Sequence, residues 1–262
     1  MTTITTALDR RLPAAHYRFR NVAAMEWIKL RSLRSMTWVL AGGMAATIAI
    51  GITAGFNTRN AAGDPTSNFM SGIVLGQVVM GVLGVLLMTS EYSSGMIRGT
   101  LAAVPRRPMV LAAKAAVYGL VALVAGEIAT FASFLGGVAA LRASVPHPAL
   151  SQPSVLRAVV MSGAYLALTG LMGLGLGAII RHSATAVATL VGGLFVLPII
   201  IGSTAGHSSG RFLPELIAGN SLSAVKPVES FTWSPWAELV IVALYVVVLL
   251  GAGGWLLVQR DA

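Results

Sequence analysis

Six long apolar runs constrain this chain more than any other feature of its sequence. A helix needs roughly 20 apolar residues to cross a hydrocarbon core of about 30 Å, and each run reaches about that length. Five of the runs contain no Asp, Glu, Lys or Arg, and the third contains only Glu127. The predicted spans are residues 38–56, 69–90, 115–140, 158–180, 184–206 and 239–258.

The composition agrees with a chain whose main solvent is lipid. Of its 262 residues 56% are hydrophobic and only 10% are charged, whereas a soluble domain carries about 25% charged residues. The runs are continuous rather than alternating, which favours helices over barrel strands. A helix also pairs all of its backbone groups within itself, as lipid requires. We therefore predict an all-α integral membrane protein, a six-transmembrane-helix bundle. It forms one transmembrane domain over residues 18–262, after a polar N-terminal tail at 1–17.

The distribution of Lys and Arg predicts the orientation, because short cytoplasmic loops carry an excess of both. With the N-terminus inside, thirteen Lys and Arg lie on the cytoplasmic side and five on the other, so both termini are predicted to be cytoplasmic. The thirteen are Arg10, Arg11, Arg18, Arg20, Lys29, Arg31, Arg34, Arg98, Arg106, Arg107, Lys114, Arg181 and Arg260, and the five are Arg59, Arg142, Arg157, Arg211 and Lys226.

The net charge of +9 could also indicate nucleic-acid binding. Aromatic residues do not interleave with the basic clusters as a stacking platform would need. Anionic lipid headgroups next to the spans explain the excess more simply. We therefore expect membrane lipids, and no nucleic acid, among the partners.

Glycine pairs at helical spacing predict close packing between the spans. Small residues four positions apart let membrane helices approach one another closely. The pattern favours a tight bundle and a second copy of the chain, although glycine is also common in membrane helices generally. The pairs are Gly51–Gly55, Gly72–Gly76, Gly173–Gly177 and Gly202–Gly206.

Two segments outside the spans are predicted to be helical. Residues 18–35 mix basic and apolar side chains without Pro or Gly, which is typical of an interfacial helix that turns into the first span. In residues 91–114, Ile97, Leu101 and Val104 form one apolar stripe on a short helix that Pro105 ends. So long a cytoplasmic connection indicates an exposed docking surface. A third segment, 207–238, is predicted to be an extracytoplasmic loop with interfacial aromatic residues.

The sequence contains no catalytic or metal-binding pattern that we can identify. It lacks a GxxxxGK[ST] phosphate-binding loop and has no cysteine. Residues 206–210 match GxSxG in letters, but no histidine follows His207 to complete a triad. The four histidines show no zinc-ligand spacing. We expect no enzymatic activity, no metal and no cofactor bound by this chain.

Glu127 is the one ionisable residue predicted to lie inside lipid. A charge at the centre of a helix costs about 2.5–3.5 kcal/mol on insertion-based scales, so it should face the bundle interior or a cavity. One interpretation is a polar group on a substrate translocation path, together with Gln77. The other is a hydrogen bond between helices, with Gln77 as a possible partner.

Residues 91–107, EYSSGMIRGTLAAVPRR, followed by Ala112-Ala113-Lys114, closely resemble the permease (transmembrane) subunits of bacterial type-2 ABC exporters. Their pattern after the second span reads roughly EY..G..R.TL…P.R, then AK. Residues 26–35, EWIKLRSLRS, resemble the N-terminal elbow helix of that family, and the ending Arg260-Asp261-Ala262 is similar to its usual C-terminus. The resemblance covers the whole chain, but its specificity is concentrated in residues 91–114.

The resemblance implies a function. Residues 91–107 would be a cytoplasmic coupling helix between spans 2 and 3, seated in a separate ATP-binding subunit that holds ATP and Mg. Two permeases, as identical copies or paralogues, would work with two ATPases in the bacterial cytoplasmic membrane. The coupling residues are Glu91, Tyr92, Gly95, Ile97, Arg98, Thr100, Leu101, Pro105, Arg106 and Arg107, and the elbow residues are Glu26, Trp27, Lys29 and Arg34.

Three other functions stay open at this point. A self-contained secondary carrier would need ionisable or broken-helix sites near the midplane, for which only Glu127 and Pro198 are candidates. A membrane-embedded enzyme and a non-transporting scaffold are the others. The cargo is equally open, among drugs, peptides and lipids.

Overall fold

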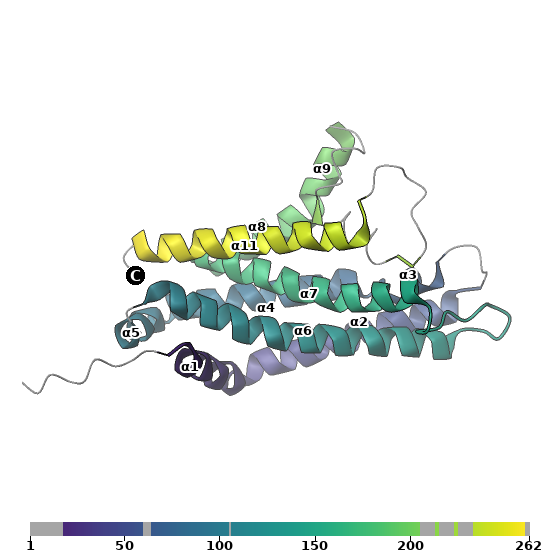
Figure 1. The fold of residues 1–262 in the computed structure, drawn as a ribbon, viewed down its shortest axis with the longest axis horizontal. Coiled ribbons are helices and arrows are strands. Elements are labelled where there is room, and N and C mark those ends of the chain that lie inside the picture. The colour runs from purple at the N-terminus through teal and green to yellow at the C-terminus, as the bar shows by residue number, and fades with distance from the viewer. Residues whose placement is uncertain are drawn as a thin grey trace, which may run out of the picture.

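The computed structural model describes residues 18–59, 64–104, 106–204, 213–214, 223–224 and 233–259. Within these ranges every regular element is a helix, and the long helices run side by side as one elongated bundle (Figure 1). The predicted all-α class is confirmed. The N-terminal tail 1–17, residues 206–210, Pro105, residues 260–262 and most of the predicted loop 207–238 lie outside the described residues.

The six predicted spans are confirmed among the described residues. The ends of the helices lie within about five residues of the predicted ends, except that the third helix begins eight residues before the predicted residue 115. The spanning helices are α2 (Arg34–Asn57), α4 (Ile73–Ser93), α6 (Arg107–Ala140), α7 (Pro153–Ile180), the continuous segment of α8 (Ser183–Val191), η1 (Gly192–Val196) and α9 (Leu197–Thr204), and α11 (Pro235–Gln259).

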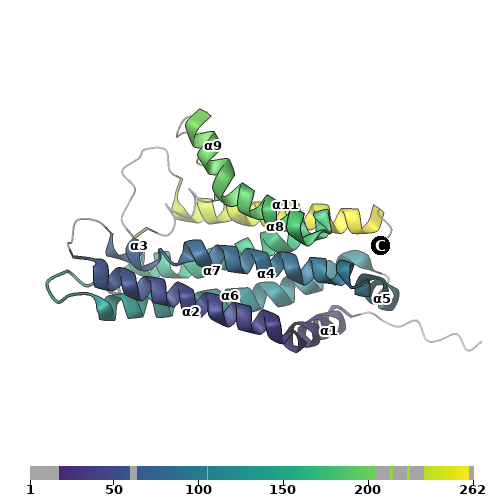
Figure 2. The same cartoon turned by 180° about the vertical axis from the view of Figure 1, so that it is seen from behind.

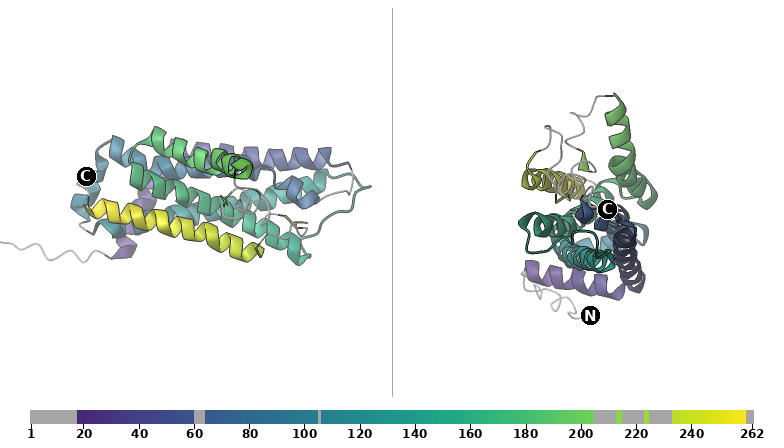
Figure 3. Two further views of the ribbon diagram at one scale, coloured as in Figure 1. Left: turned by 90° about the horizontal axis from the view of Figure 1, so that it is seen from above. Right: turned by 90° about the vertical axis from the view of Figure 1, so that its right-hand side faces the viewer.

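Three short helices lie at the ends of the bundle. They are α1 (Phe19–Ser32), α3 (Pro65–Phe69) and α5 (Met96–Ala103). Most of the predicted helix at 18–35 is present as α1, but its C-cap is Leu33, where the chain turns, and residues 34 and 35 already belong to α2. Seen along the bundle, α1 lies crosswise to the long helices (Figure 3). The helix α1, α5 and the C-terminal end of α11 all lie at one end of the bundle, which we call the α5 end (Figure 1).

Helices α4 and α7 form the centre of the bundle and meet along a glycine seam. A Cβ added at Gly173 would lie 2.0 Å from the carbonyl oxygen of Gly81, and one added at Gly84 would lie 2.0 Å from that of Gly170. The two backbones can approach this closely only because these positions carry no side chain. Three of the four predicted glycine pairs make such close approaches, whereas Gly202 has open space around it.

The fifth span bends where the sequence interrupts its helical hydrogen bonds. The π-helical turn η1 begins with Gly192-Gly193, and Pro198 follows two residues after its end. Proline has no N–H to donate to the carbonyl four residues earlier, and π-turns commonly accompany such kinks. As a result α9 leaves the side of the bundle (Figure 2), and Ile199 is 72% exposed.

Candidate functional site

The predicted coupling segment consists of the end of α4, a turn and the short helix α5. Glu91 and Tyr92 lie in the last turn of α4, and α5 begins at Met96. Gly95 connects the two helices with φ +70. Only glycine adopts this left-handed conformation without a steric cost, so Gly95 sets the direction in which α5 leaves α4.

The apolar stripe of α5 faces the chain itself, which corrects the predicted docking surface. Ile97 and Val104 are only 4% and 5% exposed, and Leu101 packs against the hydrophobic core. Val104 contacts Val22 of α1 and Val110 of α6 in a small cluster at the bundle end. Periodicity shows that a helix has an apolar face but not what covers it. The face that remains exposed consists of Met96, Arg98, Gly99, Ala102 and Ala103.

Behind α5, four charged side chains from three helices form a buried cluster. Lys114 of α6 donates hydrogen bonds to Glu26 of α1 and, at 2.7 Å, to Oε1 of Glu91. Lys29 of α1 donates to the same Glu91 oxygen at 3.0 Å and to Oε1 of Glu26 at 3.1 Å. We call Glu26, Lys29, Glu91 and Lys114 the charge cluster.

The charges of the cluster balance within the protein. Lys114 is 2% exposed, and both glutamates are 3% exposed. Unpaired ions buried this deeply would cost several kcal/mol each, but two ammonium groups here face two carboxylates. Burial alone would lower the pKa of Lys29, yet Glu26 and Glu91 outweigh it, and the pKa of Lys29 is raised above its ordinary value.

The cluster also holds α5. Lys29 donates a third hydrogen bond, at 3.0 Å, to the Thr100 hydroxyl on the buried side of α5. Helix α5 is thereby connected through one ammonium group to α1 and to the last turn of α4. A displacement of α5 would therefore act on the ends of several helices together rather than on α5 alone.

Two arginines bind the end of α11 at the same end of the bundle. Arg107 donates to the Leu257 carbonyl at 2.9 Å, and Arg181 donates to the Leu256 carbonyl at 3.2 Å. These carbonyls belong to the last turn of α11, where cations are favoured. The Arg181 guanidinium also lies 5.1 Å from the centre of the Tyr92 ring. The ends of α4, α6, α7 and α11 are thus joined.

The structure brings together some of the predicted residues and not others. Glu26, Lys29, Glu91 and Thr100, predicted in two separate segments, meet in one place. Trp27 lines a separate apolar cavity, Arg34 begins α2 and is exposed, and Arg106 is exposed. Pro105 lies outside the described residues. Lys114 is not among the predicted coupling or elbow residues, although a single lysine among alanines at the border of a span is itself a signal of pairing.

Glu127 and Gln77 lie elsewhere and do not bind each other. Gln77 is buried between α4 and α7 and accepts a 2.6 Å hydrogen bond from the Tyr165 hydroxyl. Glu127 is half-buried on α6, with its carboxylate against Gly163 of α7, and its Oε2 has no hydrogen-bond partner. The predicted alternative of a Glu127–Gln77 hydrogen bond is therefore not formed. Among the described residues no cluster of His, Cys, Asp and Glu could hold a metal ion.

The described part of the chain is a multi-pass helical membrane protein whose helix ends are joined by buried charges at one end. A family model described as ABC-2 family transporter protein matches residues 23–209, which include the whole charge cluster and α5. The chain belongs to the ABC-2 transporter family and is a permease component of it. No curated protein matches the chain.

Proposed function

We propose that the chain is the permease of an ABC exporter and receives mechanical work at α5 from a separate ATP-binding subunit. The observation that carries the proposal is the charge cluster, since it connects α5 to α1, α4 and α6. ATP and Mg are held by the partner in this scheme. Movement of α5 then reaches the spans that line a translocation path.

The exposed face of α5 suits such a partner. Met96 is 53% exposed, and Arg98 provides a cation beside it. Gly99, Ala102 and Ala103 are small and exposed, so another protein can approach the helix backbone. These features support docking of α5 into an apolar cleft with an acidic rim on the partner subunit. The buried stripe of Ile97 and Val104 instead holds α5 against its own chain.

The orientation proposed for the protein follows from the distribution of cations. Of the described Lys and Arg residues, ten lie at or near the α5 end and three near the other. The excess of Lys and Arg marks the cytoplasmic side of membrane proteins. We therefore infer that the α5 end, with the start of α1 and the end of α11, faces the cytoplasm of the bacterial cell, where the partner would find ATP.

A second permease, identical or paralogous, completes the proposed unit. Helices α2, α9 and α11 leave most of their length exposed, in contrast to α4 and α7. The bent α9 exposes Leu197, Ile199 and Ile200 away from its own bundle. A second copy would cover such an exposed helix. A translocation path between two copies would also require an exposed helix face at their interface.

Glu127 is the stronger of the two residues proposed for the translocation path. Gln77 is fully buried and accepts from Tyr165, whereas Glu127 is only partly buried and its Oε2 has no hydrogen-bond partner. In reconstituted vesicles Glu127→Gln should change transport while leaving partner binding intact. Transport that is unchanged would remove Glu127 from the path.

The docking proposal is tested by co-expression and co-purification with a candidate ATP-binding subunit of an ABC transporter. The variant Ala102→Glu places a carboxylate on the exposed face of α5, and we expect it to lose the ATPase while keeping the parent melting temperature. Ala149→Glu is the matched control, because Ala149 is exposed at the opposite end of the bundle. It should retain the ATPase.

The buried stripe provides an independent comparison. Ile97→Asp introduces an unpaired charge at a buried position and should lower the melting temperature itself, at a cost of several kcal/mol. Retention of the ATPase by Ala102→Glu would contradict docking at α5. Transport by vesicles that contain only this chain, without nucleotide, would indicate a secondary carrier instead.

A further inference from the structure

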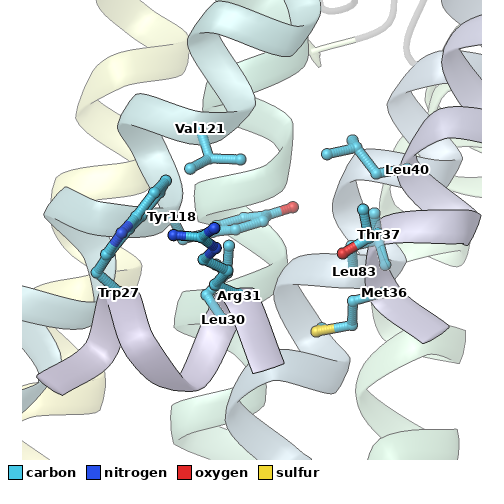
Figure 4. A pocket seen from close by; sticks show the side chains of 9 residues that line it. All are labelled: Trp27, Leu30, Arg31, Met36, Thr37, Leu40, Leu83, Tyr118 and Val121. Atoms are coloured by element: carbon cyan, nitrogen blue, oxygen red, sulfur yellow. The ribbon is translucent and has the colours of Figure 1, made fainter. Parts of the chain in front are cut away.

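An apolar cavity lies outside the charge cluster, in the angle between α1 and the bundle. Its volume is about 280 Å³, just below the range for small-molecule sites, which is roughly 300–1,000 Å³. Figure 4 shows that Trp27 and Arg31 rise from α1, that Thr37 and Leu40 come from α2, and that Tyr118 and Val121 come from α6. We call this cavity the elbow pocket.

The elbow pocket lies at the depth where lipid headgroups meet acyl chains. Tyr118 and Val121 follow Lys114 by four and seven residues along α6. At a rise of 1.5 Å per residue, they lie about 6 and 10 Å further along the helix axis than Lys114. Trp27 is half-exposed at its edge, and tryptophan favours the headgroup level. Because α1 lies crosswise to the long helices (Figure 3), the pocket lies in the angle between α1 and the sides of α2 and α6.

The pocket combines an apolar lining with one unneutralised cation. Within the described residues no hydrogen bond or ion pair engages Arg31, whereas Lys29, two residues earlier, is neutralised in the charge cluster. The hydroxyl of Tyr118, which also lines the pocket, does not bind Arg31, because it donates to the Met80 carbonyl at 2.5 Å. An occupant with a negative head and an apolar tail would satisfy both parts of the pocket.

We propose that the elbow pocket binds one anionic glycerophospholipid, with its phosphate on Arg31 and part of an acyl chain between α1, α2 and α6. The position at the leaflet surface and the charge of Arg31 select this occupant. A guanidinium binds phosphate through bidentate hydrogen bonds. The lipid would fill the angle at Leu33 and couple the tilt of α1 to the surrounding leaflet.

Fluorescence of Trp27 tests the proposal in reconstituted vesicles of the 262-residue chain. The other four tryptophans are replaced by phenylalanine, so that Trp27 alone reports. Phosphatidylglycerol with brominated acyl chains should quench Trp27 at a lower mole fraction than brominated phosphatidylcholine. One cation at an anionic surface corresponds to about a fivefold preference.

Two arginine variants separate the pocket from general surface charge. Arg31→Gln should abolish the preference for phosphatidylglycerol. Arg34→Gln is the matched control, since Arg34 is exposed three residues later and does not line the pocket, and it should keep the preference. Val121→Phe should reduce quenching by both lipids by filling the space. Equal quenching of the parent by the two lipids, or a preference that survives Arg31→Gln, would overturn the proposal.

Native mass spectrometry provides a second measurement on the chain with all of its tryptophans. Phosphatidylglycerol adducts should exceed phosphatidylcholine adducts for the parent and for Arg34→Gln but not for Arg31→Gln. If Trp27 is quenched by neither lipid, the pocket is covered by protein, and the proposal fails. It also fails if the preference appears only when nucleotide drives a bound ATPase, because the lipid would then be cargo.

Discussion

Helix α4 makes two contacts of opposite kinds within about ten residues. In its middle, Gly81 and Gly84 bring its backbone against the backbone of α7. In its last turn, Glu91 binds two lysines from α1 and α6. The glycine seam sets the distance between two neighbouring spans, while the charge cluster joins segments that are far apart in the chain.

The difference suggests how rigid and movable parts are combined. A backbone contact made through glycine can open only by separating the helices, so α4 and α7 should move as one body. In the cluster, Lys29 and Lys114 share Oε1 of Glu91, and Lys29 reaches Glu26 and Thr100 as well. Such a joint can tilt while it exchanges partners, without leaving a buried charge unpaired.

The largest expected effect is that of Lys114→Met in the charge cluster. Removal of this ammonium leaves two buried carboxylates facing Lys29 alone, which should cost about 3–5 kcal/mol of unfolding free energy. Thermal unfolding of the purified chain in detergent measures the loss. Arg106→Met, at an exposed position of the same end, should stay within about 0.5 kcal/mol of the parent.

The double variant Lys114→Met/Glu26→Gln sharpens that result. It removes one charge of each sign, so it should recover part of the stability lost in the single variant. If Lys114→Met unfolds at the parent temperature, the cluster does not join the helix ends.

The glycine seam should respond less strongly, to Gly173→Ala. The added Cβ would meet the Gly81 carbonyl oxygen at 2.0 Å, so the helix pair must separate. Overpacking costs typically about 1–3 kcal/mol, partly offset by the higher helix propensity of alanine. Gly42→Ala is the control, because nothing lies within 4 Å of the Cβ it adds. Equal melting temperatures for the two variants would refute the seam.

A smaller effect is expected when α5 is released from the cluster by Thr100→Val. This variant removes the hydroxyl that accepts from Lys29 but preserves the shape of the side chain. Hydrogen bonds to charged groups contribute about 1.5–3 kcal/mol, and Lys29 retains both glutamates, so the low end applies. Differential scanning calorimetry should show a small loss, and Thr53→Val, an exposed residue of α2, should show none.

The smallest effect concerns pH. The pKa of Lys29 in the folded chain is raised above its ordinary value of 10.5. The stabilisation of the folded state by the Lys29 ion pairs is therefore fully present below pH 10.5 and is lost as the pH rises through the folded-state pKa. The difference in melting temperature between the parent and Lys29→Met should therefore be constant across the neutral range and shrink only at alkaline pH. A difference that already falls near neutral pH would show that Glu26 and Glu91 do not hold the proton on Lys29.

Part of the candidate site could be read from residue patterns, and part could not. Glu91 and Lys114 each border a long apolar run, which identifies them as charges that need partners. Nothing in their spacing shows that the partners are each other and two residues of α1. The stripe of Ile97, Leu101 and Val104 identified α5 as a helix but misplaced its exposed face, because the same periodicity serves a docking surface and an internal contact.

The bend in the fifth span shows the same limit. Gly192-Gly193 and Pro198 are visible signals of an interrupted helix, yet the span was predicted as one continuous crossing. Only the packing of α8 against α4 and α7, and the absence of such packing along α9 in the described chain, shows which half leaves the bundle.

Apolar length is sufficient to determine the helical class and the number of spans, because lipid requires each spanning segment to pair its own backbone groups. The partners of Glu26, Lys29, Glu91 and Lys114, the exposed side of α5 and the elbow pocket were decided only by tertiary structure. Those features depend on which side chains from distant segments share one buried volume, and the pairing of buried charges is a property of that volume rather than of any single segment.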